Sequence, residues 1–190
     1  MFKKQFLRGV LLYALSLSAQ SAILIGVNTA TPQINTGDIV SFTLDISGLD
    51  SVALSSYDLS VNYNPALLQF NSAVFGDQLD IAALGLNAPA AFTGNGVVNL
   101  IEFSLDDSAT LLGKQAHNFT LARLVFTALF PGISPLDLAI NSLSDSEANT
   151  LNAQSTNSSV AITAVPVPAA IWLFTPALAF LMRRRSNLQS

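Results

Sequence analysis

The chain has no cysteine and a single histidine among its 190 residues. The lack of cysteine excludes disulfide bonds, thiolate metal sites and cysteine nucleophiles, even in an oxidising compartment. His117 lies in the polar stretch 114–118, and no Gly-x-Ser-x-Gly element accompanies it. A lone histidine has neither a nucleophile nor a group to orient it, and zinc needs more ligands than the chain offers. We therefore expect a solvated loop histidine and a protein that is not an enzyme.

Basic residues are scarce in the middle of the chain. Residues 23–165 contain only Lys114 and Arg123 as basic residues but all twelve acidic ones, so this segment carries a net charge of −10. The whole-chain charge of −4 hides this, because the remaining basic residues lie near the two ends. A segment this acidic is a poor partner for nucleic acid or anionic lipid and favours solubility, divalent cations or cationic surfaces.

Tryptophan is almost absent as well, and Trp172 lies in an apolar run over residues 169–182. The run is preceded by Val165, Pro166, Val167 and Pro168 and is closed by Arg183, Arg184 and Arg185. As a helix it would span about 20 Å, short of the ~30 Å hydrocarbon core of a membrane. The three arginines are costly to move through lipid and should stay in the cytoplasm, which places the preceding chain on the other side. The run predicts a short C-terminal transmembrane helix.

The order of these features over residues 165–187 resembles the PEP-CTERM sorting signal of Gram-negative bacteria. The match consists of the Pro-x-Pro element, Trp-Leu-Phe at the start of a short apolar helix, and the basic end. This resemblance implies export, recognition of Pro-x-Pro by an exosortase, removal of the helix, and a place in the exopolysaccharide matrix of a biofilm. Val167 stands where the family usually carries glutamate. An ordinary membrane anchor is the alternative, because hydropathy and flanking charge alone would produce one.

The N-terminus has the layout of a secretory signal peptide. Lys3, Lys4 and Arg8 precede an apolar stretch over residues 9–17, and small or polar residues follow as far as Ala22. Such a segment is an export signal and not part of the fold, and we expect cleavage after Ser21 or Ala22. The chain is thereby divided into a signal peptide (1–22), which we expect to form a helix, a body (23–164) and a sorting tail (165–190).

Turn signals punctuate the body at short intervals, and apolar residues alternate with polar ones between them. The alternation is regular over residues 40–47 and 57–63, where Tyr57 and Tyr63 share the apolar face with their hydroxyls expected at its margin. Further strands are expected over residues 24–28, 67–75, 97–103, 119–130, 136–140 and 159–163. Residues 119–130 are apolar on both faces and should lie centrally. Only residues 78–84 hint at a helix, so the pattern predicts an all-β fold, an antiparallel β-sandwich.

Two groups of motifs resemble the two halves of a cohesin-type domain. The first is Thr-Gly-Asp at 36–38, Ser-Tyr-Asp-Leu-Ser-Val-Asn-Tyr-Asn-Pro-Ala-Leu-Leu at 56–68 and Phe-Gly at 75–76. The second is Leu-Ala-Arg-Leu-Val-Phe at 121–126, Pro-Gly at 131–132 and Pro-Leu-Asp-Leu at 135–138. The resemblance covers most of residues 24–164 and implies a nine-stranded sandwich of jelly-roll topology without catalytic machinery, related in architecture to carbohydrate-binding modules. Cohesins of cellulosomes bind dockerins through one sheet face, but the sequence does not mark that face here, so dockerin binding is not carried over from the resemblance.

Acidic loop residues are the remaining candidates for a site. Asp106, Asp107, Asp145 and Glu147 are weak calcium candidates, because the ion requires several hard oxygens, but no EF-hand pattern supports them. The same residues form acid pairs of the kind that glycoside hydrolases use. Adjacent acids in loops are usually solvated, so we expect neither a metal nor another cofactor.

The sequence therefore predicts a non-enzymatic protein exported to the cell envelope, surface or extracellular matrix. Its partners would be an exosortase during sorting, the membrane through residues 169–182, and a polysaccharide or protein of the matrix bound by a sheet face or a loop rim. A carbohydrate-binding or accessory module of polysaccharide degradation is one alternative, and a carbohydrate-active enzyme is another. A passive surface scaffold is a further one, and it would differ by having no saturable ligand.

Overall fold

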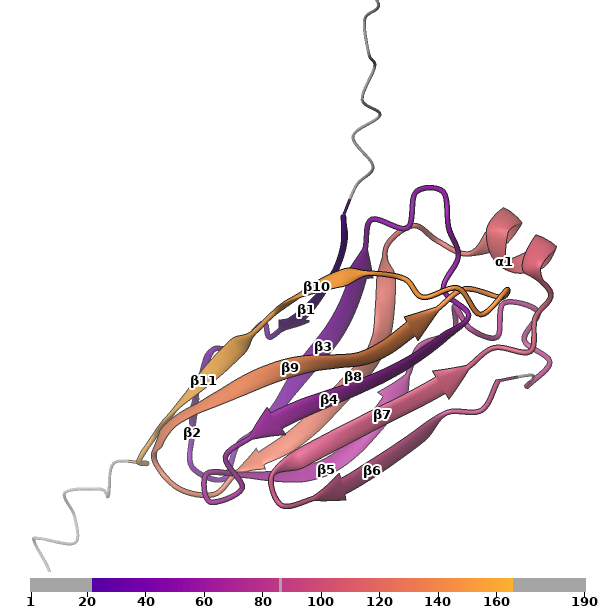
Figure 1. Ribbon diagram of the computed structural model, residues 1–190. Helices are drawn as coiled ribbons and strands as arrows, with labels where there is room; N and C mark the ends of the chain where they lie inside the picture. Colours follow the sequence, from indigo (N-terminus) through magenta and orange to yellow (C-terminus); the bar gives the residue numbers. More distant parts are fainter. Residues whose placement is uncertain (1–21, 86, 166–190) are drawn as a thin grey trace, which may run out of the picture.

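Two β-sheets packed face to face form the body of the protein (Figure 1). The computed structural model describes residues 22–165 except residue 86. One sheet contains β1 (Ile23–Asn28), β3 (Ile39–Ser47), β5 (Leu68–Phe75), β8 (Phe119–Ala128) and β10 (Ala153–Thr156). The other contains β2 (Gln33–Asn35), β4 (Ser56–Tyr63), β6 (Ala90–Gly94), β7 (Val97–Phe103), β9 (Gly132–Ser144) and β11 (Ser158–Thr163). A helix, α1 (Ser108–Lys114), lies between β7 and β8 in the chain.

The strand order is β10-β1-β3-β8-β5 in the five-stranded sheet and β2-β11-β9-β4-β7-β6 in the six-stranded sheet. The predicted all-β sandwich is confirmed, and its pairings are antiparallel except for β1 with β10 and β2 with β11. The expected count of nine strands was too low: eleven are described, because the short polar strands β2 and β10 lengthen the two sheets. The expected interior position of residues 119–130 is confirmed, since β8 lies between β3 and β5.

Two expectations about helices fail within the described residues. Residues 78–84 form turns, not a helix, and the Asp80 carboxylate accepts hydrogen bonds from the backbone N–H groups of Leu84 and Gly85 there. An aspartate that binds nearby backbone donors favours a turn over a helix. The helix that does form, α1, begins after Asp107, whose side chain accepts from the Thr110 N–H as an N-cap. With seven residues it is too short for a periodicity signal.

The space between the sheets is filled by the apolar residues of the predicted alternation. Phe126 on β8 is fully buried and makes edge-on ring contacts with Phe42, Tyr63 and Phe70, at centroid distances of 5.8, 5.0 and 5.5 Å. Tyr63 belongs to the opposite sheet, so these rings join the two layers. The buried apolar side chains of the described residues come from both sheets and form one cluster. Residues 22–165 therefore contain a core of their own and are expected to fold by themselves.

The β6–β7 hairpin depends on a tight turn at Asn95 and Gly96. Both residues have positive φ, +52° and +79° respectively, as a two-residue turn between twisted strands requires. A Cβ atom at Gly96 would also lie 2.8 Å from the Tyr63 carbonyl oxygen. Glycine is therefore needed at this position, and the turn fixes the register of β6 against β7.

The predicted export and sorting segments lie largely outside the described residues. Ser21, Pro166, Val167, Pro168, Trp172 and Arg183, Arg184 and Arg185 are not described, while Ala22 and Val165 are exposed ends of the described part. Between residues 22 and 165 there is no helix of the length and apolar character needed to cross a membrane. The predicted signal helix and the anchor over residues 169–182 remain predictions from the sequence.

Candidate binding face

A network of polar side chains lies on the outer face of the six-stranded sheet. The Asp58 Oδ1 atom accepts hydrogen bonds from the Nδ2 atoms of Asn99 (2.6 Å) and Asn141 (2.8 Å). The same two amides also donate to the Ser60 Oγ atom, at 3.2 and 2.9 Å. These four residues come from the adjacent strands β4, β7 and β9. Because each side chain is held by another, the face presents a fixed pattern of polar groups to solvent.

Strand alternation and one register shift bring the four residues together. On β4, Asp58 and Ser60 alternate with buried residues of the core, so they point outward. The pairing of β4 with β9 shifts between Asp58 and Leu59, because Asp58 lies opposite Ser142 and Leu59 opposite Ile140. Asn141 is the extra residue of this irregularity, and its side chain reaches both Asp58 and Ser60. A bulge of this kind commonly re-aims a side chain.

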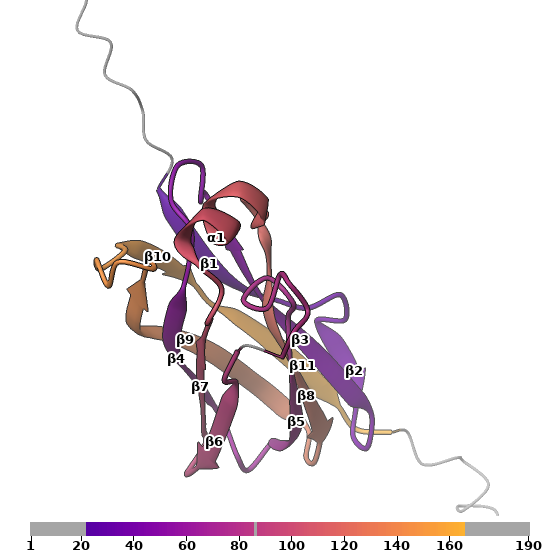
Figure 2. The same cartoon turned by 90° about the vertical axis from the view of Figure 1, so that its right-hand side faces the viewer.

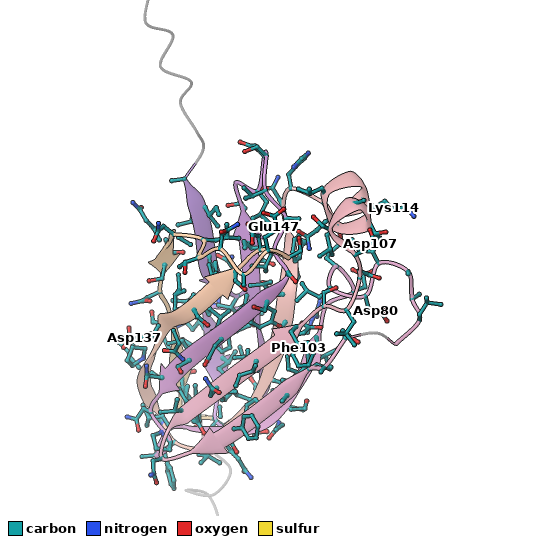
Figure 3. All side chains as sticks on the ribbon, turned by 45° about the vertical axis from the view of Figure 1, so that its right-hand side comes forward. Asp80, Phe103, Asp107, Lys114, Asp137 and Glu147 are labelled. Atoms are coloured by element: carbon teal, nitrogen blue, oxygen red, sulfur yellow. The ribbon has the colours of Figure 1, made fainter. Side chains whose placement is uncertain are left out.

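Apolar side chains border the polar network on the same face. Phe92 lies opposite Asn99, Ile101 opposite Asp58, and Phe103 opposite Ser56 in the strand register. Phe92 is 60% exposed and Phe103 is 44% exposed. Figure 3 shows Phe103 on β7, at the front of the sheet. Exposed aromatic rings beside fixed polar groups are typical of surfaces that bind another protein.

The charge on this face has one sign. Asp58 and Asp137 belong to it, and Asp137 accepts a hydrogen bond from the Asn157 side chain at 3.0 Å. The two basic residues of the described chain lie elsewhere, Lys114 on α1 and Arg123 on β8 of the other sheet. On that other sheet, burial raises the pKa of Asp45, but hydrogen bonds from Thr120, Asn28 and Thr43, with Arg123 nearby, bring it below its usual value. The six-stranded sheet thus offers uncompensated negative charge that complements a cationic partner.

Three of the four predicted calcium ligands accept hydrogen bonds from other parts of the protein. Asp106 accepts from the Ile81 N–H at 2.8 Å. Hydrogen bonds from the backbone and side chain of Thr110 lower the pKa of Asp107, the N-cap of α1. Hydrogen bonds from Asn149 and from the Glu147 N–H lower the pKa of Asp145. Asp107 and Glu147 lie at the same end of the sandwich (Figure 3), but residues 22–165 contain no group of three or more acidic or histidine side chains that could hold a metal ion.

We expect calcium to leave the thermal stability of the domain unchanged. Asp106, Asp107 and Asp145 already accept backbone hydrogen bonds, so an ion would have to replace these donors to bind them. The melting temperature of residues 22–165 in millimolar calcium should equal that in EDTA to within about 1 °C. An increase of about 5 °C or more, lost in Asp145→Asn but kept in Asp38→Asn, would establish a calcium site instead.

A buried carboxylate was not anticipated from the sequence. Glu102 on β7 is 1% exposed and accepts hydrogen bonds from the Tyr57 hydroxyl and the Asn87 amide, both at 2.7 Å. Desolvation raises the pKa of Glu102, these two hydrogen bonds partly oppose that rise, and the Asp80 carboxylate adds to it. The same burial, with Glu102 beside it, raises the pKa of Tyr57. The Tyr57 hydroxyl therefore lies inside the core, not at its margin as the alternation had indicated.

His117 has a structural contact of its own. It is exposed, and its Nδ1 atom lies 2.7 Å from the Leu49 carbonyl oxygen, while the Leu49 N–H donates to the His117 carbonyl. The ring thus holds the loop that follows β3 against the segment that precedes β8. This arrangement agrees with the expected loop histidine, and it adds a role in fixing that loop.

Comparison with known proteins shows which family has this architecture. The family model described as the cohesin domain matches residues 25–162. The chain belongs to the cohesin family. No curated protein sequence matches it significantly.

Solved cohesin structures share the fold at low sequence identity. The OlpA cohesin of Clostridium thermocellum, described as part of a type I cohesin–dockerin complex, is 14% identical with a TM-score of 0.61, covering 74% of this chain and 99% of its own. A non-cellulosomal cohesin from the archaeon Archaeoglobus fulgidus is 13% identical with a TM-score of 0.59, over 75% and 92%. The cohesin module of a family 33 glycoside hydrolase from Clostridium perfringens is 13% identical with a TM-score of 0.60, over 76% and 99%. At these identities the similarity establishes the cohesin fold.

Proposed function

We propose that this cohesin domain is a non-enzymatic binding module whose partner is a protein that docks on the outer face of the six-stranded sheet. The observation that carries the proposal is the hydrogen-bonded group of Asp58, Ser60, Asn99 and Asn141, bordered by the exposed rings of Phe92 and Phe103. The polar groups would fix the orientation of the partner, and the rings would supply the buried apolar contact at the centre of an interface.

A dockerin-type module with basic residues on its contact surface is the partner that we propose. The OlpA cohesin was crystallised in a cohesin–dockerin complex, which supports the same class of partner for this chain. The acidic character of the face supports a basic contact surface, because Asp58 and Asp137 have no cation near them on this sheet. A bound partner would remove water from the Asp58 carboxylate, which accepts hydrogen bonds from only two amides. A hydrogen-bond donor on the partner would offset the cost of this desolvation.

Asp58→Ala and Phe92→Ala are each expected to weaken partner binding about tenfold or more. Isothermal titration calorimetry against a panel of purified dockerin modules measures this directly. Val74→Ala is the matched control, since Val74 is 59% exposed on β5 of the other sheet and should leave the affinity unchanged. If Val74→Ala weakens binding and Asp58→Ala does not, the partner binds the five-stranded sheet and the proposed face is wrong.

Polysaccharide of the matrix is the second candidate partner, supported by the polar hydroxyl and amide groups of the same network. A glycan array distinguishes the two, because a carbohydrate-binding module retains defined oligosaccharides while a protein-binding module retains none. Turnover of any polysaccharide by the pure domain would indicate the enzyme alternative and contradict the proposal.

For the whole chain we propose export and sorting through the tail that resembles a PEP-CTERM signal, with an exosortase acting at Pro166 and Pro168. The support for this is the order of residues 165–187 together with the N-terminal signal layout. Intact-mass spectrometry of the protein from its native host tests it. A chain that ends near Pro168 agrees with sorting, whereas a chain that retains Arg183, Arg184 and Arg185 has a permanent anchor.

A further inference from the structure

Strand β6 is an open edge of the six-stranded sheet. It is hydrogen-bonded to β7 on one side, and no described strand pairs with its other side. Four of its five residues are exposed. Figures 1 and 2 show it at the border of the six-stranded sheet, next to β7. The backbone donors and acceptors of its free side therefore face solvent.

The other three sheet edges are protected in ways that β6 is not. β2 has three residues, β10 has four that are mostly polar, and β5 is interrupted by a register shift between Phe70 and Ser72. β6 has the sequence Ala-Ala-Phe-Thr-Gly and pairs with β7 without irregularity. It contains no charge, no proline and no bulge, which are the usual means of keeping an edge from pairing with another chain.

The hairpin turn determines which backbone groups are free. Gly94 lies opposite Val97 across a two-residue turn, so these two residues form a hydrogen-bonded pair. Hydrogen-bonded and non-hydrogen-bonded pairs then alternate along the two strands, so Phe92 is hydrogen-bonded to Asn99. The N–H and C=O groups of Ala91 and Thr93 therefore point away from β7, toward the open edge of the sheet. Phe92 has its side chain on the outer face between them.

We propose that β6 pairs with β6 of a second copy of the chain, antiparallel and centred on Phe92. In this register Ala91 of each copy lies opposite Thr93 of the other, and the two residues exchange both of their N–H···O=C bonds. Phe92 then lies directly opposite its own copy, as a cross-strand aromatic pair on the outer face. The result is a sheet continuous across both molecules, in which the two proposed binding faces point the same way.

We favour a second copy over an unrelated strand because β6 is complementary to an antiparallel copy of itself, related by a two-fold axis at Phe92. In the proposed register, the free backbone groups of Ala91 and Thr93 in both copies form hydrogen bonds. The same register places the exposed Phe92 rings of the two copies against each other. The lack of charge on β6 avoids repulsion across the pairing itself. The inference does not depend on the identity of the partner that binds the sheet face.

The association of two copies is expected to be weak and to become stronger as the salt concentration rises. Pairing of two five-residue strands buries much less than the ~1,200 Å² of a stable interface, so we expect a dissociation constant of about 0.1–1 mM. Each copy carries the acidic charge of the body, and salt screens the repulsion between copies. Self-association should therefore rise as the ionic strength rises, opposite to association driven by attraction between charges.

Sedimentation equilibrium of residues 22–165 without any partner tests the proposal. The weight-average mass should approach twice that of the monomer as the concentration passes about 1 mM, and more readily at about 0.5 M than at 0.05 M salt. Thr93→Pro removes an outward donor, which an edge strand tolerates, and should weaken the association about tenfold or more. Thr93→Val keeps the donor and should associate like the wild type.

Thr93→Pro also separates this proposal from the proposed function. Thr93 lies opposite Val98, on the side of the sheet that faces the core, so the outer binding face is unchanged in the variant and partner affinity should be retained. Circular dichroism verifies that the variant is folded. A wild-type domain that stays monomeric up to about 1 mM at both salt concentrations overturns the pairing, and so does a folded Thr93→Pro variant that associates as strongly as Thr93→Val.

Discussion

Phe126→Ala is expected to lower the free energy of unfolding by about 3–5 kcal/mol. Phe126 is fully buried on β8 and contacts Phe42 and Phe70 of its own sheet and Tyr63 of the facing sheet. Removing its ring leaves a cavity that four rigid strands cannot close, and it removes three edge-on aromatic contacts. A loss of this size is a large part of the total stability of most domains.

Urea unfolding followed by circular dichroism measures the loss, with Phe92→Ala as the matched control. Phe92 is 60% exposed on β6, so its truncation should change stability by less than about 0.5 kcal/mol. The two phenylalanine variants thus separate a residue of the core from a residue of the proposed binding face. A loss below about 1 kcal/mol for Phe126→Ala would contradict the packing described between the sheets.

Glu102→Ala is expected to lower the free energy of unfolding by about 1–3 kcal/mol. The variant leaves the Asn87 amide without its acceptor, and the Tyr57 hydroxyl keeps only a long contact of 3.4 Å with the Leu121 carbonyl oxygen. Glu102→Gln should cost less. A glutamine can accept from Asn87 and donate to Tyr57, which then donates to Leu121. Comparison of the two variants by urea unfolding at pH 7 tests whether hydrogen bonding or charge is the dominant role.

The pH dependence of Glu102→Gln relative to wild type follows from the raised pKa of Glu102. The folded protein binds this proton more tightly than the unfolded chain, so Glu102 stabilises the fold relative to glutamine most at low pH. That contribution is complete below the ordinary pKa of a glutamate, about 4.3, and is lost as the pH rises through the raised value. The stability of Glu102→Gln minus that of wild type should therefore increase from about pH 4 upward and then level off.

The difference between the two proteins is the quantity to measure, because other carboxylates act in the opposite direction. The pKa values of Asp45, Asp107 and Asp145 are lowered, so these residues lose stabilising contacts as the pH falls through their folded values. Their effects cancel between wild type and variant. A difference that is flat between pH 4 and 8, or that decreases with pH, would contradict a raised pKa for Glu102.

Much of the fold could be predicted from the sequence because its strands are half buried. Buried residues occupy every second position over most of β3 and β4, and such a period of two in the sequence indicates a strand with one buried face. β6 was not predicted. Its sequence, Ala-Ala-Phe-Thr-Gly, lies at an exposed edge, and without a buried face it shows no alternation of apolar and polar residues. β9 is also longer than the expected residues 136–140. The prediction ended too early because polar residues such as Asn141 follow in the C-terminal part of the strand.

The candidate site was harder to predict than the fold. Asp58, Asn99 and Asn141 are ordinary outward-facing polar residues when each strand is read alone. Their hydrogen bonds depend on which strands are neighbours and on a register shift between β4 and β9. The position of Glu102 was visible in principle, because it occupies an inward place in the alternation of residues 97–103, where a carboxylate needs partners.

By itself, the sequence determined the β-sandwich class, the acidic charge of the body and the lack of thiol chemistry, because composition and short-range periodicity carry that information. The tertiary structure alone decided that Asp58, Asn99 and Asn141 share one face, that Tyr57 meets Glu102 in the core and that β6 is an open edge. These features depend on strand order and register, which arise from contacts between residues distant in the chain and leave no local pattern in the sequence.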